Sequence, residues 1–298
     1  MTPLILSRVR TWVKRRVRGG IRLATTRWGR PFSTSDLLQA VRGLGVAPGD
    51  TLLVHSSLDH LGKFSGKPSD VLAVLQEAVG PGGTLLLPTL PFTGPTVDYA
   101  QQRRVFDVRR TPSRMGLLTE LFRRTPGVIR SVHPTHSVAV WGADAAALVA
   151  GHVHAKTPCG VGSPYARLLD RDGKILFLGC DVKVMTFFHT VEELLEPRMP
   201  FSPFTQQEYL LESVDADGRA WTTRTRLSDP ALVRRRNLTK LLPLLRQRAA
   251  WREWICAEGN SHVEIGGEPY FLSAEGLLMP TKRGQAPPDL RYFSPSTK

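Results

Sequence analysis

The segment FFHTVEE, residues 187–193, places one imidazole and two carboxylates within two turns of an expected helix. His189 and Glu192 are three residues apart, so they share a helix face, where the carboxylate can orient the imidazole or hold an ammonium group. An imidazole has an ordinary pKa of about 6.5, and a neighbouring carboxylate raises that pKa toward neutral pH. The pair therefore predicts a general base, His189, oriented by Glu192. A histidine at a helix N-terminus beside solvated acids is the structural alternative.

Two further histidines occur in the segment VHPTHS, residues 132–137. His133 and His136 stand before an expected strand, where an imidazole can contact a substrate or support the base. A histidine at a strand end is also commonly a structural residue with satisfied hydrogen bonds. We predict His136 in the catalytic group and His133 on the substrate side. His152 and His154 lack a third ligand at a suitable spacing, so we expect a surface loop there and no metal site.

Hydroxyl groups follow two expected buried strands. Ser56 and Ser57 come after the apolar residues of TLLVH, and Thr89 comes after those of TLLLP. Open α/β sheets bind ligands at the carboxyl ends of their strands, because the loops there are free to vary. The hydroxyls and their backbone N–H groups are therefore predicted to face one cleft. Turn residues that cap the next helix are the alternative interpretation.

The elements that must position these side chains alternate between strand and helix from about Phe32 to Pro200. The pattern predicts strands at 51–55, 84–88, 128–133, 138–142 and 174–179, and helices at about 35–44, 68–79, 113–124 and 144–151, with another opening at Ser163. Such alternation is typical of a layered α/β domain.

Beyond Pro200 the pattern changes to a hairpin that turns at Asp217 and Gly218, followed by a basic helix from Asp229 to about Ile255. We divide the chain into a basic amphipathic segment at 1–31, an α/β core at 32–200, a C-terminal α+β portion at 201–283 and a tail at 284–298.

Charge is concentrated at the N-terminus. Of the formal +14, the first thirty residues supply nine basic side chains and no acid, which leaves +5 for the remainder. Apolar residues recur there every four positions and form one helical face: Ile5, Val9, Val13, Val17 and Ile21. This pattern is typical of a helix on an anionic membrane surface. The alternatives are packing on the protein's own body, an organelle transit peptide and a polyanion-binding tail.

The composition of the chain excludes several classes of protein. The 298 residues are 41% apolar, with no stretch of about 20 uninterrupted apolar residues and no secretory signal. Three widely spaced cysteines exclude a disulfide framework and a CxxC zinc pair, which fits a cytoplasmic protein. The remainder lacks the motifs of specific nucleic-acid binding. A homo-oligomer is compatible with the sequence but is not predicted by any motif.

Five segments in order resemble the aminoglycoside 3-N-acetyltransferase family over about 34–193: GLGVAPGDTLLVHSSLDHLG, VGPGGTLLLPT, TPSRMGLLTELFRRTPGVIRSVHPTHSVAVWG, GVGSPYARLLDRDGKILFLG and FFHTVEE. The resemblance implies a three-layer α/β/α sandwich around a mixed sheet. It also implies acetyl-CoA as the acetyl donor, an amine of an amino sugar as the acceptor, and no metal.

The resemblance also implies site residues. The family's catalytic histidine falls on His189, and the segments around Ser56, Ser57 and Thr89 lie along the CoA arm. Ser113 and Arg114 fall where family members contact CoA.

The acceptor stays open at this point. Aminoglycosides are polycations, and a basic body is poorly matched to them. A local acidic pocket around Glu192, Glu193 and Glu196 would restore the match, and we predict Glu193 as a substrate contact. The alternatives are an acyltransferase that acts on a nucleotide- or lipid-linked amino sugar in surface polysaccharide synthesis, and a noncatalytic CoA- or polyanion-binding protein.

Overall fold

The fold is that of a computed structural model, which describes residues 31–61, 64–199, 201–233, 236, 238, 242–247, 251–257, 261–266, 270–272 and 278–280. The predictions for the tail at 284–298, and for the N-terminal segment apart from residue 31, lie outside the described residues.

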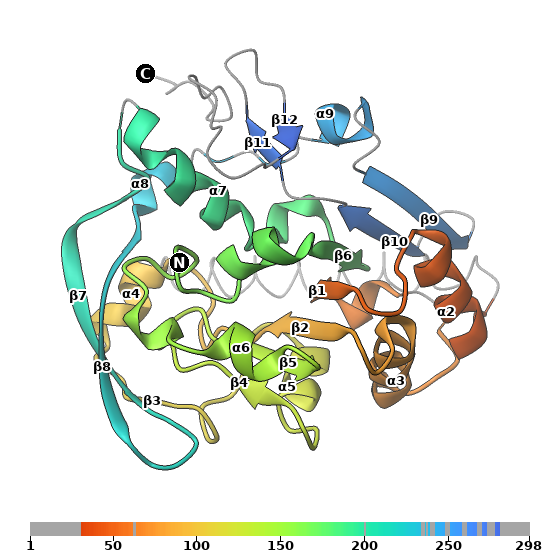
Figure 1. Cartoon of the computed structure of the whole chain (residues 1–298), viewed down its shortest axis with the longest axis horizontal. Coiled ribbons are helices and arrows are strands. Elements are labelled where there is room, and N and C mark those ends of the chain that lie inside the picture. Colours follow the sequence, from red (N-terminus) through yellow and green to blue (C-terminus); the bar gives the residue numbers. More distant parts are fainter. Residues whose placement is uncertain are drawn as a thin grey trace, which may run out of the picture.

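A seven-stranded mixed sheet forms the centre of the molecule, in the order β4-β5-β2-β1-β6-β10-β9 (Figure 1). Its strands are β1 (Thr51–Ser56), β2 (Thr84–Pro88), β4 (Ile129–Arg130), β5 (Val138–Gly142), β6 (Lys174–Leu178), β9 (Trp251–Ala257) and β10 (Ser261–Gly266). The three central strands, β2, β1 and β6, are parallel. The next strand on each side, β5 and β10, is antiparallel to its central neighbour.

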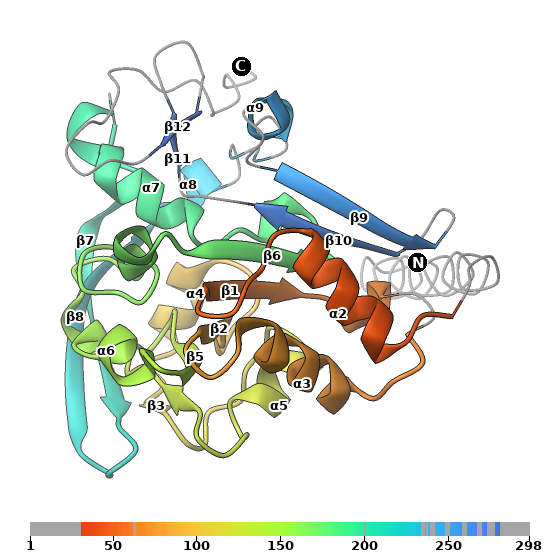
Figure 2. The same cartoon turned by 45° about the vertical axis from the view of Figure 1, so that its right-hand side comes forward.

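Helices cover both faces of this sheet. Alternate residues of a strand point to opposite faces, so neighbours such as Leu52 and Leu53 join two different hydrophobic clusters. One cluster packs α6 (Ala145–Val149) and α7 (Phe188–Leu195) against the sheet. The other packs α2 (Thr34–Gly43), α3 (Pro68–Val79) and α5 (Leu117–Phe122), which lie together in Figure 2. The predicted three-layer sandwich around a mixed sheet is confirmed.

Local sequence explains where these helices begin. Ser33 caps α2 in a capping box with Asp36, which satisfies two backbone N–H groups at the helix start. Pro68 occupies the first turn of α3, where its missing N–H costs no hydrogen bond. Both helices carry the apolar residues that fill the cluster on their side of the sheet.

The carboxyl ends of the parallel strands meet at one edge, where the predicted site residues lie. The backbone N–H of Ser57 donates to the Leu178 carbonyl at 2.8 Å, which joins the ends of β1 and β6. The N–H of Thr89 donates to the Ser137 carbonyl, also at 2.8 Å. Because β5 is antiparallel to β2, the residues just before β5 reach this edge, and His136 is among them.

A separate sheet consists of β3 (Phe106–Asp107), β7 (Phe204–Val214) and β8 (Ala220–Ser228), and its long hairpin runs along the left margin of Figure 1. The predicted turn is confirmed, with Gly218 at a φ of 84° that favours glycine. α4 (Thr96–Gln101), in a region expected to be a loop, packs against the hairpin. Two further strands, β11 (Tyr270–Leu272) and β12 (Leu278–Pro280), pair with each other.

The helix predicted from Asp229 to Ile255 is wrong. That stretch contains α8 (Pro230–Val233), α9 (Leu242–Gln247) and then the strand β9. Residues 251–257, WREWICA, contain two Trp and one Ile, which favour strands, and β10 provides an antiparallel partner for them. Strands from beyond residue 200 therefore extend the sheet of the core. In the part of the chain that the structure describes, no helix is long and apolar enough to cross a bilayer.

Candidate active site

Helix α7 holds the predicted base. Phe188, Val191 and Leu195 point into the core and fix the rotation of the helix. That rotation leaves the side chain of His189 21% exposed, whereas the side chain of Glu192 is sealed from solvent. The two residues were predicted to share a helix face, and they are in contact.

Glu192 lies between two partners. One of its oxygens, Oε2, is 2.8 Å from Nδ1 of His189. Arg236 donates from Nε to Oε1 at 2.7 Å and from Nη2 to Oε2 at 2.9 Å. A buried carboxylate is costly unless it is paired and fully hydrogen-bonded, and these contacts satisfy both conditions. The carboxylate therefore holds Nδ1 of the imidazole, which leaves Nε2 as the nitrogen that can take a proton.

Arg236 was missed by the sequence analysis. It belongs to the run RRR at 234–236, and it reaches the site from 44 residues away along the chain. A run of arginines usually indicates a solvated surface, so only the presence of an unpartnered acid in the core could have indicated its role.

His136 lies beside the predicted base. Its ring centroid is 6.0 Å from that of His189, and the two planes are nearly perpendicular, at 85°. The edge of Phe92 packs against it at 5.8 Å. Burial lowers the pKa of His136 well below its ordinary value, and the neighbouring imidazoles of His189 and His152 lower it further. His136 is therefore neutral at physiological pH.

His133 and His152 stack on each other behind His136, with ring centroids 4.5 Å apart. The prediction that His152 lies in a surface loop is wrong, because it is 1% exposed and hydrogen-bonds to Ser131 and to the Pro158 carbonyl. His133 is also fully buried, and burial is the main cause of its lowered pKa. His133 contacts His136 and His152 and is closed to solvent, whereas His154 is exposed as predicted.

Glu193 is a second acid on the same helix, mostly buried and poorly partnered. Its pKa is raised to about 7, mainly by burial and to a lesser extent by the charge on Glu196, against the opposing effects of the Val161 N–H and of Arg226. Its Oε1 accepts one long hydrogen bond, 3.4 Å, from the Val161 backbone, and its Oε2 has no partner. A side chain at Gly160 would overlap this carboxyl group, so glycine is needed there.

The hydroxyl groups at the strand ends differ from one another. Ser56 and Ser57 are partly exposed at the end of β1, and the Ser57 hydroxyl is 2.7 Å from Nδ1 of His60. Thr89 is fully buried, and its hydroxyl is bonded to Ser137 and Arg130 at 3.0 Å. The expectation that Thr89 presents its hydroxyl to a cleft is therefore wrong, because the core has taken up that group.

Arg130 is a buried cation that the sequence analysis did not identify. Besides the Thr89 hydroxyl, it donates to the Thr89 carbonyl at 2.7 Å and to the Thr111 carbonyl at 2.6 Å. Burial lowers its pKa to about 9. Its contacts fix the end of β2 to the loop that leads to Ser113 and Arg114.

That loop reaches the same edge of the sheet. The Arg114 N–H donates to the Leu90 carbonyl at 2.8 Å, one residue beyond Thr89. Ser113 is buried and its hydroxyl bonds to Thr119 at 2.7 Å, whereas Arg114 is exposed. Arg114 is thus free to meet an anion at this edge, while Ser113 stabilises the turn before α5.

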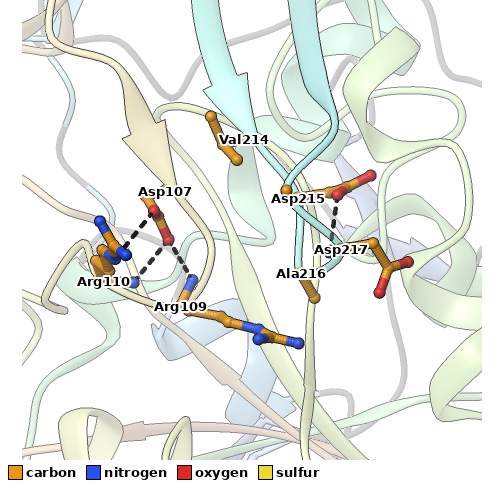
Figure 3. Close-up of a pocket in the computed structure, with 8 residues that line it drawn as sticks. Asp107, Arg109, Arg110, Val214, Asp215, Ala216 and Asp217 are labelled. Atoms are coloured by element: carbon orange, nitrogen blue, oxygen red, sulfur yellow. Dashed lines mark hydrogen bonds and ion pairs between the residues drawn. The ribbon is translucent and has the colours of Figure 1, made fainter.

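A groove of ≈ 650 Å³ lies elsewhere, between the loop after β3 and the tip of the β7–β8 hairpin. Figure 3 shows Asp107 and Arg109 on one side and Asp215 and Asp217 on the other. None of the predicted site residues lines it. Asp107 accepts two backbone N–H bonds at 2.8 Å, and Asp215 accepts the Trp221 indole, so these carboxylates stabilise turns.

Among the described residues, no group of three or more His, Cys, Asp or Glu side chains is arranged to hold a metal ion. The arrangement at α7 consists of an ion-paired carboxylate, an accessible imidazole and a neutral imidazole next to it. Such a site can accept a proton from a nucleophile, so the fold and site define a candidate acid–base enzyme of the three-layer α/β/α class.

Residues 53–263 match the family model described as aminoglycoside 3-N-acetyltransferase. The match covers more than half of the chain, which therefore belongs to this family. The resemblance noted in the sequence is confirmed.

Curated relatives of this chain support the same family assignment. The chain is 32% identical to aminoglycoside N(3)-acetyltransferase VII of Streptomyces paromomycinus, over 56% of this chain and 62% of that protein. It is 31% identical to aminoglycoside N(3)-acetyltransferase IX of Micromonospora chalcea, over 57% of this chain and 65% of that protein. The matched region thus spans a little under two thirds of these relatives' length.

Solved structures extend the likeness of the fold. Aminoglycoside acetyltransferase AAC(3)-Xa superposes with a TM-score of 0.69 at 28% identity, over 85% of this chain and 93% of that one. AAC-VIa bound to sisomicin superposes with a TM-score of 0.63 at 27% identity, over 80% of this chain and 93% of that one.

Proposed function

We propose that the protein is an acetyl-CoA-dependent N-acetyltransferase that modifies an amine of an aminoglycoside-type amino sugar, with His189 as the general base. One observation carries the proposal: Glu192, held by Arg236, fixes the partly exposed His189 imidazole at the carboxyl edge of a sheet whose fold is that of aminoglycoside acetyltransferases. The names of the matched family and relatives support the donor and the class of acceptor.

The chemistry follows from the geometry. The acceptor amine first loses its extra proton to solvent, because an ammonium has no lone pair with which to attack. Nε2 of His189 then takes the next proton as the amine nitrogen bonds to the acetyl carbon. The bond between that carbon and sulfur breaks, and the proton passes from the imidazole to the thiolate. Glu192 stabilises the imidazolium that exists between the two transfers.

Acids on α7 support a cationic acceptor. Glu193 is a mostly buried carboxyl group with an unpartnered oxygen, four residues after His189. That oxygen, Oε2, is sealed from solvent, so an ammonium group would meet the other oxygen, Oε1, which holds only one long hydrogen bond, from the Val161 N–H. This local charge answers the objection that the body carries +5, since capture depends on the potential at the site rather than on the net charge.

At the donor side, the accessible groups at the sheet edge are Ser56, Ser57 and the exposed Arg114. We assign the hydroxyls and the N–H groups near them to the extended arm of acetyl-CoA, and the guanidinium to one of its phosphates. Ser113 acts indirectly, because its hydroxyl is engaged with Thr119.

The test is thiol release from acetyl-CoA in the presence of sisomicin or gentamicin. We expect turnover by the native protein, and a loss of about 10² to 10⁴ in His189→Ala, the usual contribution of a general base. His154→Ala is the matched control, because His154 is exposed on a different element. Absence of thiol release with aminoglycosides would exclude this acceptor class, and near-normal turnover by His189→Ala would exclude the base.

The same assay with nucleotide-linked amino sugars tests the first alternative acceptor. A preference for those substrates would place the protein in glycoconjugate synthesis. Acetyl-CoA binding without turnover on any amine would favour the noncatalytic alternative.

We also propose a cytoplasmic location, with residues 1–30 at the anionic inner surface of the membrane. The support comes from the sequence: three cysteines without a disulfide framework, and nine basic side chains combined with a regular apolar face.

A further inference from the structure

The hydrogen bonds around His136 determine which of its ring nitrogens carries the proton. Nδ1 of His133 is the starting point, because the backbone N–H groups of His136 and Thr135 both point at it, at 3.2 and 3.4 Å. A backbone N–H can only donate. Nδ1 of His133 is therefore unprotonated, and the proton of this neutral ring is on Nε2.

The Thr135 hydroxyl transmits this constraint to His136. It lies 3.3 Å from Nδ1 of His133 and 3.0 Å from Nδ1 of His136. The single lone pair of the His133 nitrogen already accepts two N–H groups, so the hydroxyl proton is directed to His136. Nδ1 of His136 then accepts a hydrogen bond, and Nε2 carries the proton.

Nε2 of His136 has no hydrogen-bond partner among the described residues, and it is not among the atoms that are sealed from solvent. The ring lies next to that of His189, with 6.0 Å between centroids and 85° between the planes, so both imidazoles border the same part of the site. Because the ring is only 5% exposed and is uncharged, its free N–H is a fixed dipole in a region of low dielectric constant.

We propose that His136 is a neutral hydrogen-bond donor whose Nε2–H stabilises the acetyl oxygen as that oxygen becomes negative during transfer. Thr135 and His133 are positioning residues that select this tautomer. The inference rests on the proposed acetyl transfer and assigns opposite tasks to two adjacent imidazoles. His189 takes the proton of the amine, and His136 donates a hydrogen bond to the oxygen without losing its own proton.

Substitutions at position 136 separate a donor from a base. We expect His136→Ala to lower kcat by about 10² to 10³ with little change in the KM for acetyl-CoA, which is the usual effect of removing an oxyanion donor. His136→Gln places an amide N–H near the position of Nε2 and should recover at least tenfold of that loss. His136→Glu offers only acceptors when ionised and should recover nothing. Equal activity of the Gln and Ala variants would overturn the assignment.

Thr135 provides an independent pair of variants. Thr135→Ser keeps the hydroxyl and should retain most of the turnover, whereas Thr135→Val keeps the shape without the hydroxyl and should lower kcat about tenfold. Both variants are checked for the native melting temperature, because Thr135 is fully buried. If Val and Ser variants of equal stability turn over equally, the hydroxyl has no part in setting the tautomer.

Nitrogen-15 spectra of the histidine-labelled full chain read the tautomer without any substrate. We expect the His136 signals of a neutral ring protonated at Nε2, identified by their loss in His136→Gln, and a mixed tautomer in Thr135→Val. A ring protonated at Nδ1 would overturn the inference. Because this measurement does not depend on turnover, it fails or succeeds separately from the proposed acetyltransferase activity.

Discussion

Glu193, which we propose as an acceptor contact, is expected to lower the stability of the folded chain at neutral and alkaline pH. Its pKa in the folded chain is about 7, against 4.5 for a free side chain, so the folded state binds more protons than the unfolded state between these values. Its contribution to stability is present below pH 4.5 and is lost as the pH rises through 7.

We therefore expect Glu193→Gln to raise the free energy of unfolding by about 3 kcal/mol at pH 8 and to leave it nearly unchanged at pH 4.5, measured by urea unfolding. The KM for a cationic acceptor should rise in the same variant at pH 8. Glu77→Gln, at an exposed surface pair with Arg42, is the control and should change neither quantity. A Glu193→Gln protein that is less stable than the native chain at pH 8 would contradict the assigned desolvation.

At the scale of elements, α7 depends on the segment that follows α8. Arg236 neutralises the fully buried Glu192, so its removal leaves a buried carboxylate with only the imidazole as partner. We expect Arg236→Gln to lower the free energy of unfolding by about 3 kcal/mol and to reduce kcat at least tenfold, because Glu192 no longer holds His189 in place.

The comparison variant is Arg224→Gln, which breaks the exposed pair with Glu208 on the hairpin and should cost less than 1 kcal/mol. A double-mutant cycle with Glu192→Gln isolates the coupling between Arg236 and Glu192. Equal stability of Arg236→Gln and Arg224→Gln would show that the buried pair contributes nothing beyond a surface pair.

The dependence of α7 on Arg236 also marks the limit of prediction from the sequence. His189 and Glu192 were predicted correctly as neighbours, because a spacing of three residues within a helix is a local property. Apolar runs bounded by Gly and Pro likewise placed β1, β2 and β6. The sequence could not predict the contacts of two arginines, Arg236 and Arg130, or the burial of His152. Their partners lie on other elements, and the tertiary fold decides which residues are buried. The strand β9 was mistaken for a helix for the same reason, since its pairing with β10 outweighed the local pattern.

Over the whole molecule, buried neutral histidines make the fold sensitive to acid. Burial lowers the pKa of His55 to about 3, and its ring stacks on Phe177 at 5.4 Å. The unfolded chain takes up a proton at about pH 6.5, so the stability that depends on a neutral His55 is present above that pH and is lost as the pH falls toward 3.

Between pH 7.5 and pH 5 this single ring accounts for about 2 kcal/mol of lost stability. The His55→Leu variant should therefore lose about 2 kcal/mol less stability than the native chain between pH 7.5 and pH 5, measured by urea unfolding. The substitution breaks no hydrogen bond of Nε2, because that atom has no partner in the native chain. His154→Leu, at an exposed position, should follow the native pH profile. Parallel profiles of the native chain and His55→Leu would show that His55 is not buried in its neutral form.

The basic N-terminal segment is attached where the body begins, since Phe32 is buried and pairs with Phe64 beside the start of α2. Its nine charges are each worth about 1 kcal/mol near an anionic surface, and its apolar face would add burial in the lipid. We therefore expect the full chain to sediment with mixed phosphatidylserine and phosphatidylcholine vesicles, and a chain that lacks residues 1–30 to stay in solution.

A variant with Ile5, Val9 and Val13 changed to Ser keeps every charge. Its loss of sedimentation would indicate insertion of the apolar face, whereas retained, salt-sensitive sedimentation would indicate a polyanion-binding tail. Equal sedimentation of the full and shortened chains would exclude any role of the segment at a membrane.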